Sequence, residues 1–423
     1  MITNDNFKHM RIKPFHNAPS ATRLLPCSFA RAIEGSHIIY NARDARMCVW
    51  ALMLLLLSGC IREPLLHLPG DPRDIEIPVV DLRLEAYWDY ELEYGVTYDW
   101  RAEWIYGWDE IDTHLFGEIG YTEPTVFDIR RYYTHRIPYS PHTSVLAATV
   151  KGTTFHGEFD FGYWDILVWS KDEPLYGEVP SMNINESLDS VTAYTNSSTR
   201  AARYQAPQYA RAFYQTEQLF STYSQAVEIN EQLDGFEYDA ERNVWVKRLN
   251  MLLEPITYIY LTQVILHNNR NKIIGIDGAA DLSAMSKSTN VNTGVSEDIP
   301  ITVTYNSRFK PNVGLESGEV VAVAGGRLMT FGIPGQNGNR IKHISEVKDT
   351  EHHYMDLNMI FNNGVDSTFV FDVSDQVRKR WKGGVITVEL DMDTIPVPRR
   401  SGGSAFNAVV KDYEDGGTYE FPM

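Results

Sequence analysis

From Asp74 onward the sequence is divided into short alternating or aromatic-rich runs, which Gly, Pro, Asn and Asp separate. Such runs between turn-forming residues are typical of β-sandwiches, whereas βαβ folds alternate strands with longer helical patterns. The pattern therefore predicts an all-β fold. The expected strands are 75–84, 95–105, 125–134, 144–149, 153–161, 163–169 and 190–195 in the first half, and 244–253, 256–266, 272–280, 299–305, 318–324, 328–333, 353–361, 367–373 and 384–390 in the second.

A polar stretch at 230–243 separates the two groups of strands and contains Asp234-Gly235, a dipeptide that favours a turn. A chain of 423 residues is long enough for two or three domains. We therefore expect an N-terminal β-sandwich at 75–235 and a C-terminal β-sandwich at 240–423.

Two local patterns within the second group carry further expectations. The run at 256–266 has apolar residues on both of its faces, which predicts a central strand buried on both sides. Gly325-Gly326 and Gly416-Gly417 are expected to lie in turns, where glycine is favoured.

The N-terminal region contains an apolar run that ends in a cysteine. Residues 47–57 are eleven apolar residues in succession, which suit a secretory signal but are too few to cross a bilayer as a helix. The run continues into Leu57-Ser58-Gly59-Cys60, which resembles a bacterial lipobox. We expect an N-terminal extension and signal peptide at 1–59, a lipid on Cys60, and an extended tether at 60–74. The alternative, a buried core helix, is disfavoured because the run has no amphipathic period.

Charge and cysteine content limit the classes of partner and site. The chain has 38 Lys+Arg against 56 Asp+Glu, a net charge of −18. Because nucleic-acid binding needs clustered cations, we expect no nucleic-acid partner. Cys27, Cys48 and Cys60 are the three cysteines, so the sandwiches have no thiol for a metal site or a disulfide.

Sequence motifs of catalysis are absent. The chain has no G-x-S-x-G, H-E-x-x-H, P-loop or strand-linked G-x-G-x-x-G motif. His352 and His353 are adjacent, so on a strand they point to opposite faces and do not chelate a metal together. A glycosidase would need two carboxylates across a cleft, but acids such as Asp109, Glu110 and Asp112 are expected on a solvated surface. We therefore expect no enzyme activity, metal or cofactor.

An aromatic cluster in the first half admits two interpretations. Trp88, Trp100, Trp104 and Trp108 could form a flat platform for sugars or a protein interface. The favoured alternative is core packing, because Trp100 and Trp104 have the even spacing of one strand face. Solvent exposure of these side chains separates the two interpretations. The other aromatic residues considered with them are Tyr87, Tyr90, Tyr94, Tyr98, Tyr106, Trp164 and Trp169.

Two segments of the second half carry a family resemblance. Residues 256–294 combine a long strand with Ala280-Asp281-Leu282-Ser283-Ala284-Met285 and end in Asn290…Gly294; Phe371–Val377 is followed by Gly384–Val388. These patterns resemble the second domain of Bacteroidetes fimbrillin-type minor fimbrial anchor lipoproteins. The resemblance implies two tandem transthyretin-like or immunoglobulin-like sandwiches, tethered by lipid to the outer membrane. The Tyr/Trp-rich first half departs from the family pattern, which leaves a separate Bacteroides lipoprotein subgroup of it open.

The resemblance also implies a function. In the family, such proteins hold or terminate a fimbria assembled by strand exchange, so we expect a non-enzymatic surface lipoprotein that binds fimbrial subunits or other surface proteins. The alternative is a glycan-binding surface lipoprotein that uses exposed Trp and Tyr. The cell surface and the periplasmic face both stay open. Ser190, Ser367 and Thr394 each follow Asp, as in O-glycosylation sites of Bacteroidetes surface proteins, and would need exposed hydroxyls.

Overall fold

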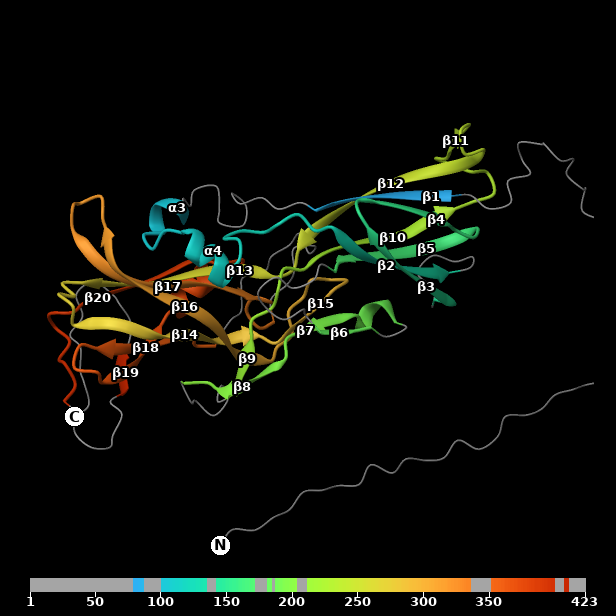
Figure 1. The fold of residues 1–423 in the computed structure, drawn as a ribbon. Coiled ribbons are helices and arrows are strands. Elements are labelled where there is room, and N and C mark those ends of the chain that lie inside the picture. Colours follow the sequence, from blue (N-terminus) through green and yellow to red (C-terminus); the bar gives the residue numbers. More distant parts are fainter. Residues whose placement is uncertain are drawn as a thin grey trace, which may run out of the picture. The chain divides into compact units, whose positions relative to one another are not determined.

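The computed structural model describes residues 79–86, 100–134, 142–171, 181–184, 187–203, 211–335, 351–399 and 407–410. The expected signal peptide, the tether, Cys60 and Trp88 lie outside the described residues. Within them the chain is almost entirely β-structure, arranged in two large sheets and one small one (Figure 1). This confirms the expected fold class of tandem β-sandwiches.

The first large sheet curls into a sandwich. Its strand order is β3-β2-β5-β10-β12-β1-β4, with β11 paired to β12. β3 and β4 lie at opposite ends of this order although only Gly152 and Thr153 separate them in sequence, so the sheet turns back on itself. Its strands are β1 (Val79–Ala86), β2 (Val126–Thr134), β3 (Ser144–Lys151), β4 (Thr154–Glu158), β5 (Gly162–Ser170), β10 (Phe220–Ile229), β11 (Glu237–Asp239) and β12 (Val244–Pro255).

The second large sheet folds at a single long strand. Its order is β20-β13-β17-β16-β14-β18-β19-β21, and β9 and β8 continue from β16. β16 pairs with β14 through its first half and with β17 through its second half. Its strands are β8 (Ser197–Ala201), β9 (Arg211–Tyr214), β13 (Tyr258–His267), β14 (Ile273–Ser286), β16 (Pro300–Gly314), β17 (Val320–Thr330), β18 (Tyr354–Phe361), β19 (Asp366–Asp372), β20 (Gly384–Asp391) and β21 (Asn407–Val410).

Strand β13 is buried on both faces, as its sequence pattern predicts. Tyr260 and Val264 pack in the core of the second sandwich, whereas Ile259, Leu261 and Ile265 pack on the opposite face with residues of the first half. Apolar side chains on both faces are stable here because each face has a covering layer.

The cover of the second face of β13 comes from between β1 and β2. This segment includes α3 (Trp100–Glu103), which contacts β20, and α4 (Glu110–Phe116), which contacts β16 (Figure 1). The Gln263 side chain accepts hydrogen bonds from the backbone N–H groups of Ile105 (2.9 Å) and Tyr106 (3.1 Å). The segment is thereby tied to the second sheet, and its aromatic side chains supply the apolar cover.

Part of this segment is helical, although the sequence predicts a strand at 95–105. The N–H of Trp104 donates to the carbonyl of Trp100 at 3.0 Å, as in a helical turn. A spacing of four residues places two side chains on one face of a helix as well as on one face of a strand. The even spacing of the two tryptophans therefore did not distinguish the two structures.

The polar stretch at 230–243 is a hairpin within the first sheet rather than a passage between sheets. β11 pairs with β12 across it, and β12 also pairs in parallel with β1, Val79 opposite Val246. The chain leaves the first sheet at Pro255 and enters the second at Tyr258. The polar composition indicated a turn, but it did not show that the turn lies inside the first sheet. The division into two independently folded domains stays a prediction.

Five small elements complete the described fold. β6 (Ser181–Asn183), β7 (Thr192–Tyr194) and β15 (Ser288–Asn290) form a sheet that joins residues of both halves of the chain. A 3-10 turn at Leu188–Ser190 precedes β7, and α5 (Ser374–Lys379) precedes β20.

Gly325 and Gly326 lie within β17 and not in a turn. A Cβ on Gly325 would be 2.6 Å from the Tyr106 ring and 2.9 Å from the carbonyl oxygen of Thr262. The glycine lets the covering segment approach the sheet closely, which explains its place inside a strand.

Candidate strand-accepting edge

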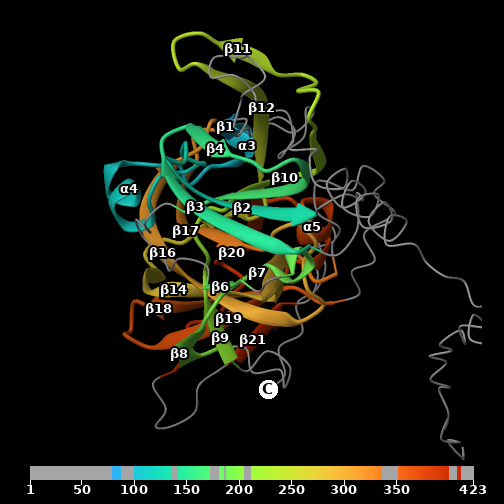
Figure 2. The same ribbon diagram turned by 90° about the vertical axis from the view of Figure 1, so that its right-hand side faces the viewer.

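Strand β3 forms one edge of the first sheet. It pairs with β2 along its whole length, from Ser144 opposite Tyr133 to Lys151 opposite Val126. None of the described strands pairs with its other side, and Figure 2 shows it beside β2 at the border of the sheet. An eight-residue edge is long enough to template another strand.

The direction of each backbone group on β3 follows from its pairing. The N–H of Gly152 donates to the carbonyl of Thr125 at 2.8 Å, which makes this a hydrogen-bonded pair of the antiparallel ladder. Because such pairs alternate, the N–H and C=O groups of Val145, Ala147 and Thr149 point away from β2. Among the residues that the structure describes, none hydrogen-bonds to these backbone groups.

The side chains of β3 do little to protect this edge. Natural edge strands are commonly blunted by charges, proline or a bulge. In β3 the single charged residue is Lys151 at the end of the strand, and no proline is present. Leu146 is 41% exposed near its middle. The strand is therefore suited to accept an extended segment through main-chain hydrogen bonds.

The edge of β20 in the second sheet is covered by side chains instead. The Gln376 amide donates to the carbonyl of Thr387 (2.8 Å) and accepts from its N–H (2.9 Å), so one side chain occupies the place of a neighbouring strand. Arg380 donates to the carbonyl of Val385 on the same strand. These contacts leave β20 less available to a partner than β3.

Strand β4 has a different kind of protection. It is five residues long, and His156 on it hydrogen-bonds to the buried Asp81 of β1 at 2.7 Å. Arg242 donates to the same carboxylate at 2.8 Å. Although burial alone would raise the pKa of Asp81, the hydrogen bonds from Arg242 and His156 lower it overall. Charges thus blunt β4, whereas the middle of β3 has none.

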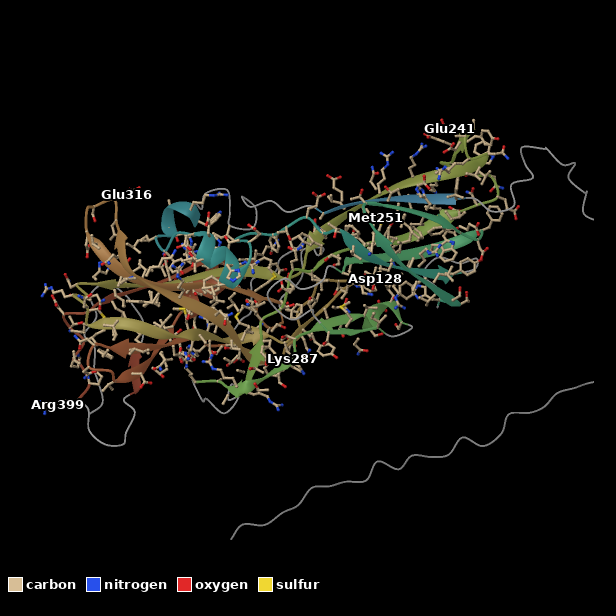
Figure 3. All side chains as sticks on the ribbon, in the orientation of Figure 1. Asp128, Glu241, Met251, Lys287, Glu316 and Arg399 are labelled. Carbon is tan, nitrogen blue, oxygen red and sulfur yellow. The ribbon has the colours of Figure 1, made fainter. Side chains whose placement is uncertain are left out.

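Asp128 on β2 fixes the inner side of the β3 edge. Its carboxylate accepts a hydrogen bond from the Thr149 hydroxyl and lies 3.0 Å from the Lys171 ammonium. Figure 3 labels Asp128 on the first sandwich. Since these side chains are tied to one another across β3, β2 and the end of β5, the edge is held in a defined position.

A cleft lined by apolar and charged residues adjoins the end of β3. It has a volume of about 690 Å³, within the range of ligand sites. Thr149 and Lys151 of β3 contribute to its wall, together with Glu123, Lys171 and Arg327. Charges of both signs line part of it, so a partner strand on β3 would meet charged side chains at this end.

Two of the carboxylates named above, Asp109 and Asp112, hold α4 to β16 through ion pairs, an arrangement that we call the lock. Asp109 and Asp112 make a capping box at the start of α4. Asp112 is 0% exposed, accepts a hydrogen bond from the Tyr106 hydroxyl (2.7 Å), and lies 2.6 Å from the Lys310 ammonium and 2.9 Å from the Arg308 guanidinium. This corrects the expectation that Asp112 lies on a solvated surface. The same acids are occupied in holding α4 to β16.

The described tryptophans differ in how deeply they are buried. Trp100 and Trp104 are each 7% exposed and pack in the core, which favours core packing over a sugar platform for these two residues. Trp108 is half-buried, and its indole N–H donates to the Thr113 hydroxyl at 3.1 Å. Trp164 and Trp169 are also buried.

The histidine pair faces in two directions, as a strand-like spacing predicts. His353 is buried and His352 is exposed. Within the described part of the chain, no group of three His, Cys, Asp or Glu side chains is placed to hold a metal ion.

The three glycosylation candidates differ in access. Ser367 is 3% exposed, so its hydroxyl is inaccessible to a glycosylating enzyme in the folded protein. Ser190 is half-buried, and its hydroxyl donates to the Ser187 carbonyl at 2.9 Å. Thr394 is exposed, and its hydroxyl donates to the Asp391 carbonyl at 2.7 Å. Glycosylation of Ser190 and Thr394 stays a prediction.

The sequence predicted β3 as a strand but gave no sign that it forms an edge. Its low charge and lack of proline are compatible with an edge or a centre. Only the pairing of β2 with β5 on its other side leaves β3 at the border.

A comparison with models of protein families finds no match, and a search of curated protein sequences finds none. In the described residues, no helix has the length and apolar character needed to traverse a bilayer.

Solved structures with a similar fold come from Bacteroidetes. A candidate adhesin from Bacteroides ovatus has 14% identity and a TM-score of 0.43, covering 79% of this chain and 100% of that one. The fimbrial anchor protein Mfa2 from Porphyromonas gingivalis has 13% identity and a TM-score of 0.34, covering 74% and 90%. A fimbrial assembly protein from Parabacteroides distasonis has 9% identity and a TM-score of 0.27, covering 75% and 92%.

Proposed function

We propose that this chain is a non-enzymatic, lipid-anchored surface protein that serves in fimbrial adhesion or assembly, as an anchor or an adhesion component, by binding a strand of another protein. The open backbone edge of β3 carries the proposal. An incoming strand would gain main-chain hydrogen bonds from that edge, and alternate side chains would set its specificity. The partner is a fimbrial subunit or another surface protein.

The two faces beside β3 define the pattern of the incoming strand. Leu146, Ala148 and Val150 point to one face, where Val150 packs against the apolar core of the first sandwich. Val145, Ala147, Thr149 and Lys151 point to the other face, where Val145 packs against an apolar cluster and the last two residues lie beside the cleft. A matching strand has apolar residues toward the first face. Toward the second face it has an apolar residue near Val145 and a polar one near Lys151.

Membrane attachment is the second part of the proposal and belongs to Cys60. The thiol would carry the lipid that keeps the sandwiches at the membrane, with the outer membrane as the expected site. In cells fed a radioactive fatty acid, Cys60→Ala should give an unlabelled, unprocessed precursor. Continued labelling of that variant would show that Cys60 is not the lipid site.

The β3 edge is tested by removing one outward N–H group. Ala147→Pro deletes the donor that faces away from β2, while the inner ladder keeps its hydrogen bonds. The purified variant should no longer capture the fimbrillin-like subunits encoded beside the gene in a pull-down. Ala147→Ser is the matched control, because it changes the side chain but keeps the N–H, and it should capture them as the wild type does.

Folding of both variants is checked by circular dichroism and thermal unfolding. If Ala147→Pro fails to fold, Ala147→Lys places a charge on the same edge and should also abolish capture. Full capture by a folded Ala147→Pro or Ala147→Lys protein would exclude β3 as the binding edge. Deletion of the gene should release fibres into the medium while their subunits are still made.

A further inference from the structure

A segment of the first half of the chain lies on the edge of the second sheet. Residues 197–203 and 211–214, which we call the strap, contain β8 and β9. β9 pairs in parallel with β16, Ala212 opposite Thr302, and this ladder is three residues long on each strand. The preceding β7 and the following β10 belong to other sheets. The strap is therefore an excursion that is held to the second sheet by a short ladder, by side-chain hydrogen bonds of Arg200 and Arg203, and by the packing of Phe213 against the core.

Two buried carboxylates lie beside the strap. Asp281 of β14 and Asp356 of β18 are direct cross-strand partners and are 0% and 1% exposed. Like charges opposite each other destabilise a sheet, and a buried charge needs a compensating one. The described residues supply this compensation from the strap, through Arg200 and Arg203.

The strap meets these carboxylates by charge more than by hydrogen bonds. The Arg200 guanidinium is 3.6 Å from Asp281 Oδ1, and the Arg203 guanidinium is 3.9 Å from Asp356 Oδ1. The backbone N–H of Arg203 donates to Asp281 Oδ2 at 3.1 Å, but the Arg203 side chain donates to the Ala279 carbonyl and to Asp277. Asp281 Oδ1 accepts no hydrogen bond from a described residue.

This arrangement differs from a fully satisfied ion pair. A guanidinium bound directly to a carboxylate makes two hydrogen bonds of about 2.7–2.9 Å. At Asp281 the buried oxygen Oδ1 lacks such a bond. An arginine placed closer could donate a hydrogen bond to this oxygen, which the strap does not do.

We propose that Asp281 and Asp356 are the recognition centre of a second strand-binding site, which the strap fills in the unbound protein and yields to an arginine-bearing strand of a partner. The biological partner rests on the proposed function, since the site would serve the same assembly role as β3. A strand without cations would leave the buried carboxylate of Asp281 without the guanidinium charge that Arg200 supplies, and would be rejected. Exchange breaks the three-residue ladder and the hydrogen bonds of Arg200 and Arg203, which the backbone and the arginines of the incoming strand would replace.

A peptide tests the site without a fimbrial partner. The probe is a fluorescent 18-residue peptide with the sequence of residues 197–214. The receptor is the full chain with Arg200→Ala, which weakens the strap. Fluorescence anisotropy should show binding of this peptide. A matched peptide in which Arg200 and Arg203 are alanine, and in which the third arginine, Arg211, is kept, should bind more weakly by more than about tenfold. Equal binding of the two peptides, or no binding, would overturn the proposal.

A disulfide across β9 and β16 tests whether the strap must leave. Ala212→Cys and Thr302→Cys, added to the same receptor, are register partners at a separation that suits a disulfide, and the natural cysteines all lie in the first 60 residues. Oxidation should abolish peptide binding and reduction should restore it, while either single cysteine variant binds in both conditions. Binding that survives oxidation would overturn the proposal.

Hydrogen exchange provides a measurement on the wild-type chain. If the strap is exchangeable, the amides of Ala212–Tyr214 should exchange faster than those in the middle of β14, which stays in the sheet. Equal protection of the two would overturn the proposal. The Ala147→Pro pull-down is independent of these results, so either proposal can fail while the other stands.

Discussion

Asp112→Asn is the substitution that tests how the covering segment is held to the second sheet. The carboxylate is buried and joins four groups: the Tyr106 hydroxyl, the Asp109 backbone N–H, the Lys310 ammonium and the Arg308 guanidinium. Asparagine has almost the same shape but no charge. Both cations would then lose their buried counter-charge while they remain largely enclosed.

The expected cost follows from these contacts. Removing one partner of a buried ion pair costs about 3–5 kcal/mol. Asp109 stays within 2.8 Å of Arg308 and 3.4 Å of Lys310 and offsets part of this loss. We therefore expect a loss in the free energy of unfolding near the lower end, about 3 kcal/mol. Asp109→Asn is the matched control, because Asp109 is 45% exposed and asparagine is also a good N-cap, and it should cost less than about 1 kcal/mol.

Urea unfolding followed by tryptophan fluorescence measures both variants. The slope of the free energy against urea should stay unchanged, so that the shift in midpoint reports stability. If Asp112→Asn is no more destabilising than Asp109→Asn, the buried carboxylate does not act as the lock. A normal midpoint with a changed slope would also contradict the reasoning.

Two further predictions concern pH and backbone packing. Burial alone would lower the pKa of His267, but the hydrogen bonds and charges of Glu319 and Glu389 raise it overall. The stabilisation from protonated His267 should therefore be complete below pH about 6.5 and be lost as pH rises through the higher folded pKa, so the difference in Tm from His267→Gln should vanish at alkaline pH. Gly325→Ala should cost about 1–3 kcal/mol in urea unfolding, while Gly275→Ala, where nothing lies within 4 Å of the new Cβ, should cost little; equal effects would refute the close-approach argument.

Patterns that depend on neighbouring residues were predictable from the sequence. The run at 256–266 has apolar side chains on both faces, and β13 is buried on both faces. The fold class followed from the same kind of signal, because the alternation of side chains along a strand is a local property. The acids at the start of α4 show the limit of this reasoning. Composition predicted a solvated surface, whereas Asp112 is enclosed by cations from β16, nearly 200 residues away in sequence.

The sequence by itself determined the strand-rich architecture and the candidate lipid site at Cys60, since both depend on residues close together in the chain. Only the tertiary structure decided which strand lies at an edge and which charges meet. The sequence predicts strands at both β3 and β13. Backbone N–H and C=O groups are nearly the same in every residue, however, so they do not indicate which strand pairs with which. Strand order is fixed when the two cores pack, as when β1 pairs in parallel with β12 across more than 150 residues. For that reason the open edge of β3 and the facing pair Asp281 and Asp356 became visible only in the folded chain.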